Sequence, residues 1–377
     1  MNVPKSTYSD LILCSRCRCG FCRTGCATYP ILGMESLTAR GRNAVALSLL
    51  DGLVDVSQGL AERFFLCTTC GFCKERCPLD VDAVKINESL RAELVKKGFT
   101  RPEHDVFTKR IETVHNPYGE SHEERMKWLP SGTEIAGKAD IAYFVGCTTA
   151  YRRPEIAEAT ARILSGAGVD FTTLHPEEWC CGSPAMRVGR RDLFLRLARH
   201  NLQSIRSAGV KRVVTSCAGC YRVLKKEYPE FVGEIPFEVV HTSELIAELI
   251  KDGSLKLSKE VAETVTYHDP CHLGRHSGIY EQPREVLKSI PAIKFVEMLK
   301  NRENARCCGA GGGVKASFPD FAIQAAVGRL EEAEEVGARS IVSTCPFCAH
   351  NLRDAIRESG SRLKFYDLTE LVAKTMS

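Results

Sequence analysis

The chain has 377 residues, 44% hydrophobic and 26% charged, so it is long enough for two or three domains with sizeable cores. Its 51 lysines and arginines nearly balance 47 acidic residues, and a net charge of +4 gives no reason to expect nucleic acid as a partner. The N-terminus lacks a signal peptide's apolar segment, and no apolar stretch approaches the roughly 18 residues of a membrane helix. We therefore expect a cytoplasmic protein that reaches a membrane only through a partner subunit.

The 19 cysteines are the strongest feature of the composition. A reducing cytoplasm keeps thiols free, so cysteines there are usually metal ligands or catalytic groups. Disulfide scaffolds belong mainly to small secreted domains, whereas structural zinc commonly uses C-x-x-C pairs. We expect iron–sulfur clusters, with structural zinc as the alternative.

Residues 67–78 contain the pattern C-x2-C-x2-C-x3-C-P, which typically holds a cubane 4Fe-4S cluster and gives its fourth cysteine to a neighbouring cluster. An incomplete copy lies 51 residues upstream, with Arg16 at the position of the first ligand. Cys14 and Cys17 flank this gap, and either can supply the missing ligand. The spacing favours Cys14, because C-x-C leaves little loop to reach around a cluster, although C-x4-C-x2-C is also a 2Fe-2S spacing.

Exchange of the fourth cysteine predicts which thiols share each cubane. One cubane takes Cys14, Cys19, Cys22 and Cys77, and the other takes Cys26, Cys67, Cys70 and Cys73. Helices are expected over residues 36–50, 57–66 and 82–97, the last ended by Gly98. Residues 1–100 are thus predicted to form a helical ferredoxin domain, and residues 101–137 a connector draped over the surface.

Short apolar strands alternate with helices from residue 138 onward. Strands are expected near residues 141–145, 169–174, 210–215, 264–268, 292–297 and 340–343, and helices near 154–167, 191–207, 220–228, 283–289, 320–336 and 348–358. This alternation argues for parallel sheets covered by helices. We predict two Rossmann-like α/β domains, residues 138–255 and 256–377, related by pseudo-twofold symmetry.

Each α/β domain carries the same frame of a single cysteine, an adjacent pair and a C-x-x-C. The first frame is Cys147, Cys180, Cys181, Cys217 and Cys220, and the second is Cys271, Cys307, Cys308, Cys345 and Cys348. Ligands of parallel sheets gather beyond the carboxyl ends of the strands, where these cysteines are expected. Five cysteines exceed what a cubane or a zinc ion needs, and the spacing leaves open whether one is spare or the cluster is unusual. The repeat extends to Glu244-Leu245-Ile246-Ala247 and Glu370-Leu371-Val372-Ala373.

Glycines beside the cysteine pairs are candidate cofactor-binding positions, because glycine lets the backbone approach a cluster: Gly182, Gly309 and Gly311. No G-x-G-x-x-G opens a strand–helix unit, so we expect flavin or haem only on a partner. His272 and His350 lie near the predicted cluster sites. The sequence leaves two roles open for them: donating protons to product thiolates, or forming a structural hydrogen bond. Several basic residues are candidates either for attracting an anionic substrate or for a solvated surface: Arg187, Arg190, Arg191, Arg275 and Lys315.

The sequences Cys180-Cys181-Gly182 and Cys307-Cys308-Gly309 resemble the signature of the CCG-domain family. The segments His268-Asp269-Pro270-Cys271-His272 and residues 307–313 are similar to that family's second repeat. With the N-terminal double-cluster motif, the chain most resembles the catalytic iron–sulfur subunits of heterodisulfide reductases. It also resembles iron–sulfur subunits of glycolate, lactate and glycerol-3-phosphate dehydrogenases.

The resemblance implies that each five-cysteine frame holds a non-cubane 4Fe-4S cluster through all five thiols. It further implies an oxidoreductase that takes electrons from a flavoprotein or cytochrome b-type partner through the two cubanes. A disulfide, such as a coenzyme M/coenzyme B-type heterodisulfide, would then be cleaved to thiols between the two non-cubane clusters. The alternative is an electron-transfer subunit of a flavin-dependent hydroxy-acid or glycerol-3-phosphate dehydrogenase. Both frames are intact here, which favours disulfide chemistry, because many of those dehydrogenase subunits have degenerate motifs.

Overall fold

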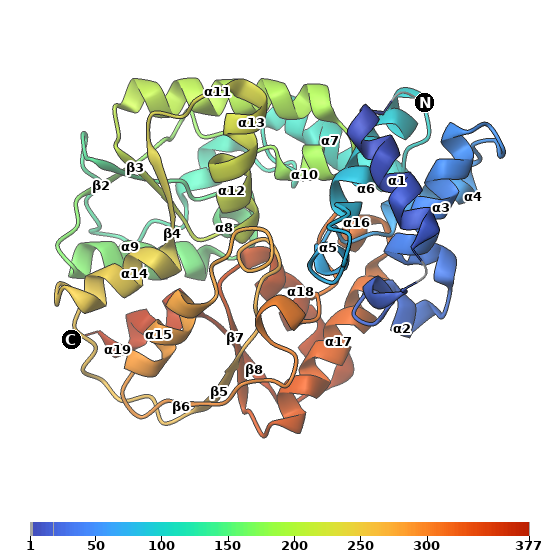
Figure 1. Cartoon of the computed structure of the whole chain (residues 1–377). Coiled ribbons are helices and arrows are strands. Elements are labelled where there is room, and N and C mark those ends of the chain that lie inside the picture. The colour runs from blue at the N-terminus through green and yellow to red at the C-terminus, as the bar shows by residue number, and fades with distance from the viewer. Residues whose placement is uncertain (1–2, 18, 377) are drawn as a thin grey trace.

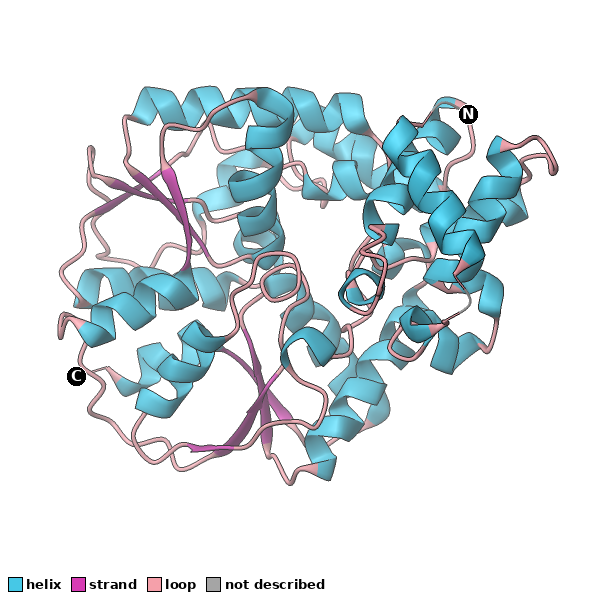
Figure 2. Cartoon of the chain, in the orientation of Figure 1, coloured by secondary structure: helices cyan, strands magenta, loops and turns pink. Residues whose placement is uncertain are grey.

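Eight short strands form two separate parallel sheets, and helices surround both of them (Figures 1 and 2). The computed structural model describes residues 3–17 and 19–376. The N-terminal helices form a third part of the molecule, at the right of Figure 1. The expected combination of a helical N-terminal domain and two α/β domains is confirmed.

The two sheets have the same strand order, β2-β1-β3-β4 and β6-β5-β7-β8. Their strands are β1 (Ile141–Tyr143), β2 (Phe171–Thr173), β3 (Arg212–Thr215), β4 (Glu238–His241), β5 (Thr264–Tyr267), β6 (Lys294–Phe295), β7 (Ser340–Ser343) and β8 (Lys364–Asp367). In the first sheet Ala142 pairs with Thr172 on one side and Val213 on the other. The fourth strands, β4 and β8, were not among the predicted elements, because each runs directly into the helix that follows it and no turn separates the two patterns.

Equivalent capping boxes, with His241 and Asp367 as the N-caps, start the last helix of each α/β unit, α14 (Thr242–Lys251) and α19 (Leu368–Thr375). Glu244 accepts a hydrogen bond from the His241 backbone N–H at 2.9 Å, and Glu370 accepts one from Asp367 at 2.8 Å. These bonds satisfy N–H groups that the first turn of a helix leaves free. The recurring glutamate of the Glu-Leu-x-Ala repeat therefore has a structural role.

Reciprocal helix contacts join the two α/β units. Helix α19 of the second unit packs on α9 (Pro154–Gly166) of the first, and α14 of the first packs on α15 (Glu281–Ser289) of the second. Because α9 corresponds to α15 and α14 to α19, the two contacts are equivalent and indicate pseudo-twofold symmetry. The other helices of these units are α8 (Cys147–Arg152), α10 (Ser183–Arg187), α11 (Arg191–Ala208), α12 (Ala218–Arg222), a π-helical turn (Val223–Glu227), α13 (Tyr228–Val232), α16 (Val314–Ser317), α17 (Pro319–Glu335) and α18 (Pro346–Ser359).

The N-terminal domain is helical, as predicted. Its helices are α1 (Lys5–Arg16), α2 (Thr28–Leu32), α3 (Ala39–Leu50), α4 (Gln58–Phe65), α5 (Phe72–Glu75) and α6 (Ala83–Lys96). Thr38, Ser57 and Asp82 accept hydrogen bonds from the first backbone N–H groups of α3, α4 and α6. Helix α1, which carries Cys14, was not predicted.

Residues 101–137, expected to form a connector over the surface, contain α7 (Pro102–Val114) and a 3-10 helix (His122–Met126). Most of their side chains are exposed or half-buried, but those of Ile111, Arg125 and Trp128 are at most 1% exposed and anchor the segment. The segment has few apolar residues, but it buries polar and charged ones through hydrogen bonds. No described helix is long and apolar enough to cross a membrane.

Arg91 on α6 joins all three parts of the molecule. Its guanidinium is fully buried and donates hydrogen bonds to the carbonyl oxygens of Phe64 and Cys67 in the N-terminal domain. It also donates to the carbonyl oxygens of Arg187 in the first α/β unit, at 2.7 Å, and Gly312 in the second, at 2.9 Å. Burial lowers the pKa of Arg91 to about 10, so the side chain stays charged at neutral pH.

Replacing Arg91 by methionine is expected to destabilise the folded chain by about 3–5 kcal/mol, because several carbonyl groups remain buried without a donor. Urea unfolding of anaerobically purified protein, followed by far-UV circular dichroism, measures the change. Lys85 on the same helix is the matched control, since it also reaches the first α/β unit through Glu230, but with exposed side chains. Lys85→Met should cost less than about 1 kcal/mol. Equal effects of the two substitutions would contradict the role given to Arg91.

Candidate metal centres

The five cysteines of each α/β unit lie beyond the carboxyl ends of its strands. Cys147 and Cys271 follow β1 and β5, and Cys217 and Cys345 follow β3 and β7. The adjacent pairs lie in the loops before α10 (Cys180-Cys181) and α16 (Cys307-Cys308). All ten thiols are free, and all except the partly exposed Cys271 are buried.

Thiol–thiol interactions connect each set of five in the same order. In the first unit the order is Cys147, Cys180, Cys181, Cys220 and Cys217. In the second it is Cys271, Cys307, Cys308, Cys348 and Cys345. The Sγ atoms of Cys181 and Cys220 are 3.4 Å apart, and those of Cys308 and Cys348 are 3.3 Å apart. The structure therefore brings together all five cysteines of each frame, including the supernumerary one.

The two sets meet at the boundary between the α/β units. Cys217 of the first set interacts directly with Cys345 of the second. The thiols of Cys220 and Cys345 lower the pKa of Cys217 well below its ordinary value, and those of Cys180 and Cys220 lower the pKa of Cys181 to about 6. The same interactions raise the pKa of the partner thiols Cys220 and Cys345, so in each close pair one thiol is favoured as the thiolate, the form that binds metal, and the other as the donor to it.

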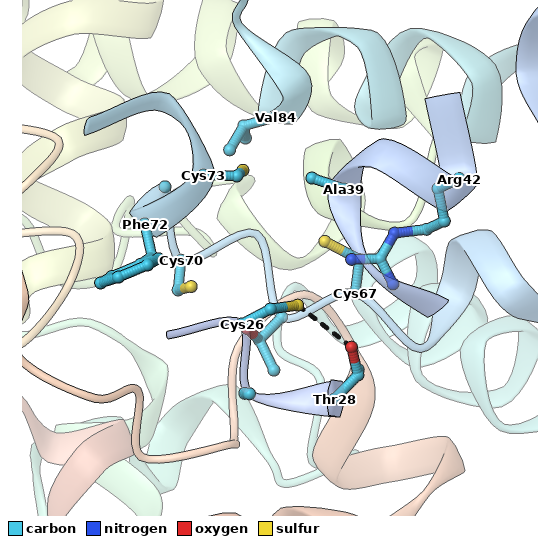
Figure 3. A pocket seen from close by; sticks show the side chains of 12 residues that line it. Cys26, Thr28, Ala39, Arg42, Cys67, Cys70, Phe72, Cys73 and Val84 are labelled. Atoms are coloured by element: carbon cyan, nitrogen blue, oxygen red, sulfur yellow. Dashed lines mark hydrogen bonds between the residues drawn. The ribbon is translucent and has the colours of Figure 1, made fainter. Parts of the chain in front are cut away.

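One pocket in the N-terminal domain is lined by Cys26, Cys67, Cys70 and Cys73, the four cysteines predicted to share a cubane (Figure 3). Cys26 comes from the upstream motif, and the structure places it with the three cysteines of the downstream motif. The Sγ atom of Cys26 is 3.1 Å from the Thr28 hydroxyl (Figure 3).

Arg42 also lines this pocket and was missed by the sequence analysis (Figure 3). Burial works against its charge, but the thiols of Cys67, Cys26 and Cys73 outweigh it and raise the pKa of Arg42. Its Nη1 is buried and has no hydrogen-bond partner among the described residues. A buried guanidinium with one unpaired nitrogen, beside four thiols, suits an anionic group bound in the pocket.

This pocket adjoins the second five-cysteine set through Cys70, whose thiol interacts with Cys307. Arg275 lies at the same junction and donates hydrogen bonds to the carbonyl oxygens of Cys70 at 2.7 Å and Ala305 at 2.6 Å. Burial opposes its charge, but Cys70, Cys271 and Cys307 raise the pKa of Arg275. Contacts among thiols thus run from the pocket through both α/β units.

The remaining N-terminal cysteines form a second group within this domain. Asn43 donates a hydrogen bond to the Cys14 Sγ atom at 3.2 Å, and burial, with Cys77 among its neighbours, raises the pKa of Cys14. Burial also raises the pKa of Cys22 to about 11, with Cys14 and Cys19 close by. Cys17 interacts with Cys19 and also lies close to Cys14. The structure therefore brings together Cys14, Cys19, Cys22 and Cys77, with Cys17 beside them.

Arg125 is a second residue that the sequence did not single out. Its guanidinium lies 3.7 Å and 3.8 Å from the Cys147 Sγ atom and forms a buried ion pair with Glu178. Glu178 also accepts hydrogen bonds from the backbone N–H groups of Val145 and Gly146, just before Cys147. The network fixes a positive charge beside the first five-cysteine set.

The candidate glycines permit close packing. A Cβ at Gly182 would lie 2.8 Å from Phe194 on α11, and one at Gly309 would lie 2.6 Å from the Ala322 carbonyl on α17. A Cβ at Gly311 would lie 2.7 Å from the Thr68 carbonyl, next to Cys67. Gly311 thus brings the second α/β unit against the cysteine loop of the N-terminal domain.

Most of the candidate basic residues hold the three parts of the chain together. Arg187 forms buried ion pairs with Glu88 on α6 and with Glu227. Arg190 pairs with Asp105 and Arg191 donates to Ser89, whereas Lys315 pairs with Asp354 within its own unit. These contacts give them structural roles.

The two candidate histidines differ in position. His350 makes a 3.0 Å hydrogen bond with Arg153 of the first unit. His272 lies beside Gly219, which stands between Cys217 and Cys220 in the sequence. Its Nε2 is buried and has no hydrogen-bond partner in the described part of the chain. Burial, reinforced by Arg222, holds the pKa of His272 well below its ordinary value.

The donor sets fit iron–sulfur clusters better than structural zinc. Zinc takes four ligands in a closed tetrahedron, whereas each α/β unit presents five mutually close thiols. Backbone N–H groups also point at sulfur, as at Gly309 to Cys307 and Thr69 to Cys67, both at 3.4 Å. Hydrogen bonds of this kind surround iron–sulfur clusters.

Comparison with known families agrees with these sites. Residues 141–225 and 265–353 match the cysteine-rich CCG domain, and residues 11–81 match a 4Fe-4S dicluster domain. A crystal structure of a hypothetical protein from Helicobacter pylori aligns with the whole chain and 73% of that protein, with a TM-score of 0.64 and 11% identity. That likeness concerns the fold alone.

Two curated relatives place the chain more closely. It is 42% identical to the D-type subunit of the dihydromethanophenazine:CoB–CoM heterodisulfide reductase of Methanosarcina mazei, over all of this chain and 96% of that protein. It is 35% identical to the probable iron-sulfur-binding oxidoreductase FadF of Bacillus subtilis, over 84% of this chain and 47% of that protein. The chain is an iron–sulfur oxidoreductase subunit and belongs to the CCG-domain family of heterodisulfide reductase D-type subunits.

Proposed function

We propose that the chain is the disulfide-reducing subunit of a complex, and that its substrate is a heterodisulfide of the coenzyme M/coenzyme B type. The contact between Cys217 and Cys345 carries this proposal, because it places two complete five-cysteine sites side by side. A disulfide takes up two electrons and two protons as its S–S bond breaks and two thiols form. Two adjacent one-electron sites can act on both sulfur atoms.

Clusters bound at the four sites, two cubane and two non-cubane 4Fe-4S, would supply the one-electron carriers of this reaction. The order of sites along the thiol contacts gives the proposed path. Electrons would enter at the Cys14, Cys19, Cys22 and Cys77 site and pass to the Cys26, Cys67, Cys70 and Cys73 site. The Cys70–Cys307 contact then leads to the second α/β unit, and Cys345–Cys217 leads to the first.

The N-terminal domain is the proposed docking place for a flavoprotein or cytochrome b-type partner that supplies the electrons. Eight large apolar side chains among the described residues are exposed in this domain: Tyr8, Leu13, Phe21, Leu32, Met34, Leu53, Val54 and Leu79. Cys19 is exposed in the same domain. Exposed apolar side chains near an electron entry site suit a partner interface. Any attachment of this chain to a membrane would come through that partner.

We expect thiol substrates to change the EPR spectrum of the oxidised, cluster-loaded protein. Coenzyme M and coenzyme B, added separately, should each be tested for a new paramagnetic state, because a substrate thiol would bind at the paired sites. Reduced dye should then convert the heterodisulfide to two thiols. A loaded protein that shows neither effect would instead be an electron relay, as in a flavin-dependent hydroxy-acid or glycerol-3-phosphate dehydrogenase.

Metal analysis tests the cluster content directly. Anaerobically reconstituted protein is expected to contain about 16 iron and about 16 acid-labile sulfide per chain, from four four-iron clusters. Zinc without labile sulfide would contradict all four assignments.

Alanine substitutions test which thiol completes the first cubane. Cys14→Ala should lose about four iron per chain, because Cys14 accepts the Asn43 hydrogen bond and lies next to Cys77 and Cys22. Cys17→Ala is the matched control and should retain them. The reverse pattern would assign the ligand to Cys17.

A further inference from the structure

The two five-cysteine sites differ at one equivalent position. The backbone N–H of Phe144 donates to the Val214 carbonyl at 2.8 Å, and that of His268 donates to the Val342 carbonyl at 2.8 Å. Phe144 and His268 therefore occupy the same place at the ends of β1 and β5. Both are buried, but only His268 carries polar ring atoms.

The imidazole of His268 lies against the second set of thiols. One of its ring nitrogens and the Sγ atoms of Cys308 and Cys348 all lie within 4.8 Å of one another. Its Nε2 is buried and has no hydrogen-bond partner within the described residues. A buried donor without a partner is costly, so an acceptor at this position would stabilise the site.

Arg329 determines which ring nitrogen carries the proton. Its Nε donates a hydrogen bond to the His268 Nδ1 at 3.1 Å, and its guanidinium is fully buried and paired with Glu332. Because arginine has donors and no acceptor, Nδ1 must accept, and the proton of the neutral ring lies on Nε2. Binding iron through Nε2 would require loss of that proton, which favours a hydrogen-bond donor over a metal ligand.

The partner of His268 is also specific to the second unit. Helices α11 and α17 begin at equivalent residues, Arg191 and Pro319, which places Asn201 at the position of Arg329. Asn201 instead donates to the Cys180 carbonyl at 3.0 Å. The two units thus carry a Phe–Asn pair in the first and a His–Arg pair in the second.

We propose that His268 donates a hydrogen bond from Nε2 to the sulfur atoms of the second five-cysteine site, and thereby raises the reduction potential of the cluster held there. The donor stabilises the more negative, reduced state, since hydrogen bonds to sulfur are one of the factors that set cluster potentials. Arg329 holds the ring in the donating tautomer. This inference rests on the proposed loading of the site with an iron–sulfur cluster.

The test is an EPR-monitored redox titration of the full-length, anaerobically reconstituted protein. His268→Phe introduces the first unit's own residue and should make reduction of the second-site cluster about tenfold less favourable. For a one-electron couple this lowers the midpoint potential by about 59 mV. His268→Gln keeps an N–H donor of similar reach and should restore most of the potential.

Three further variants make the result specific. Cys147→Ala and Cys271→Ala each remove a thiol of one five-cysteine site, so the signal that is lost only in Cys271→Ala identifies the second-site cluster beside the first-site cluster and the two cubanes. Phe144→Leu, at the equivalent position, removes no donor and should leave the second-site potential unchanged.

An unchanged potential in a fully loaded His268→Phe protein would overturn the proposal. So would the nitrogen hyperfine coupling of a direct iron ligand in the wild-type protein. Wild-type protein without iron and labile sulfide would overturn the cluster assignment itself, which distinguishes that failure from a failure of the His268 role alone.

Discussion

The buried guanidinium of Arg91 is the contact on which the arrangement of the three domains depends. Among the described residues, its hydrogen-bond acceptors are backbone carbonyl oxygens from all three parts of the chain. Two of them, at Cys67 and Gly312, belong to the loops where the N-terminal pocket adjoins the second α/β unit. A point charge on a flexible stem could not serve so many carbonyls at once, which makes arginine better suited than lysine. The hydrogen bonds of Arg91 therefore fix the three domains relative to one another, and with them the cysteines where the N-terminal pocket adjoins the second α/β unit.

Duplication gave the chain two equivalent scaffolds that differ in the charges around them. Arg125 stands beside Cys147 in the first unit, whereas Arg275 stands where Cys271 and Cys307 meet Cys70 in the second. Neither arginine comes from an equivalent position, since Arg125 belongs to the segment before the first unit. Equal thiol sets can therefore have unequal electrostatic surroundings without any change in their ligands.

Cysteine spacing predicted much of the site, because the spacing reflects short local loops and strand ends. The first three strands of each sheet, the exchange of Cys26 into the second pocket and the gathering of each five-cysteine set follow from such patterns. The edge strands β4 and β8 were missed because each runs directly into the following helix with no turn between them. Arg42, Arg91 and Arg125 were missed for another reason: each acts through contacts with residues distant in sequence, and an arginine in a sequence is usually a surface residue. Likewise, the buried side chains of the 101–137 connector, among them Arg125 and Trp128, could not be picked out from its mostly polar sequence.

Pseudo-symmetry locates the centre of the proposed reaction. Cys217 and Cys345 are equivalent residues of the two units, and equivalent residues that contact each other must lie near the axis relating them. The reciprocal packing of α9 with α19 and of α14 with α15 sets the same axis. A substrate with two sulfur atoms would bind across that axis with one sulfur toward each site. The two halves of a heterodisulfide differ from each other. The two sites have the same thiols but different neighbours, Phe144 at the first and His268 at the second, and such a pair suits a heterodisulfide better than two identical sites would.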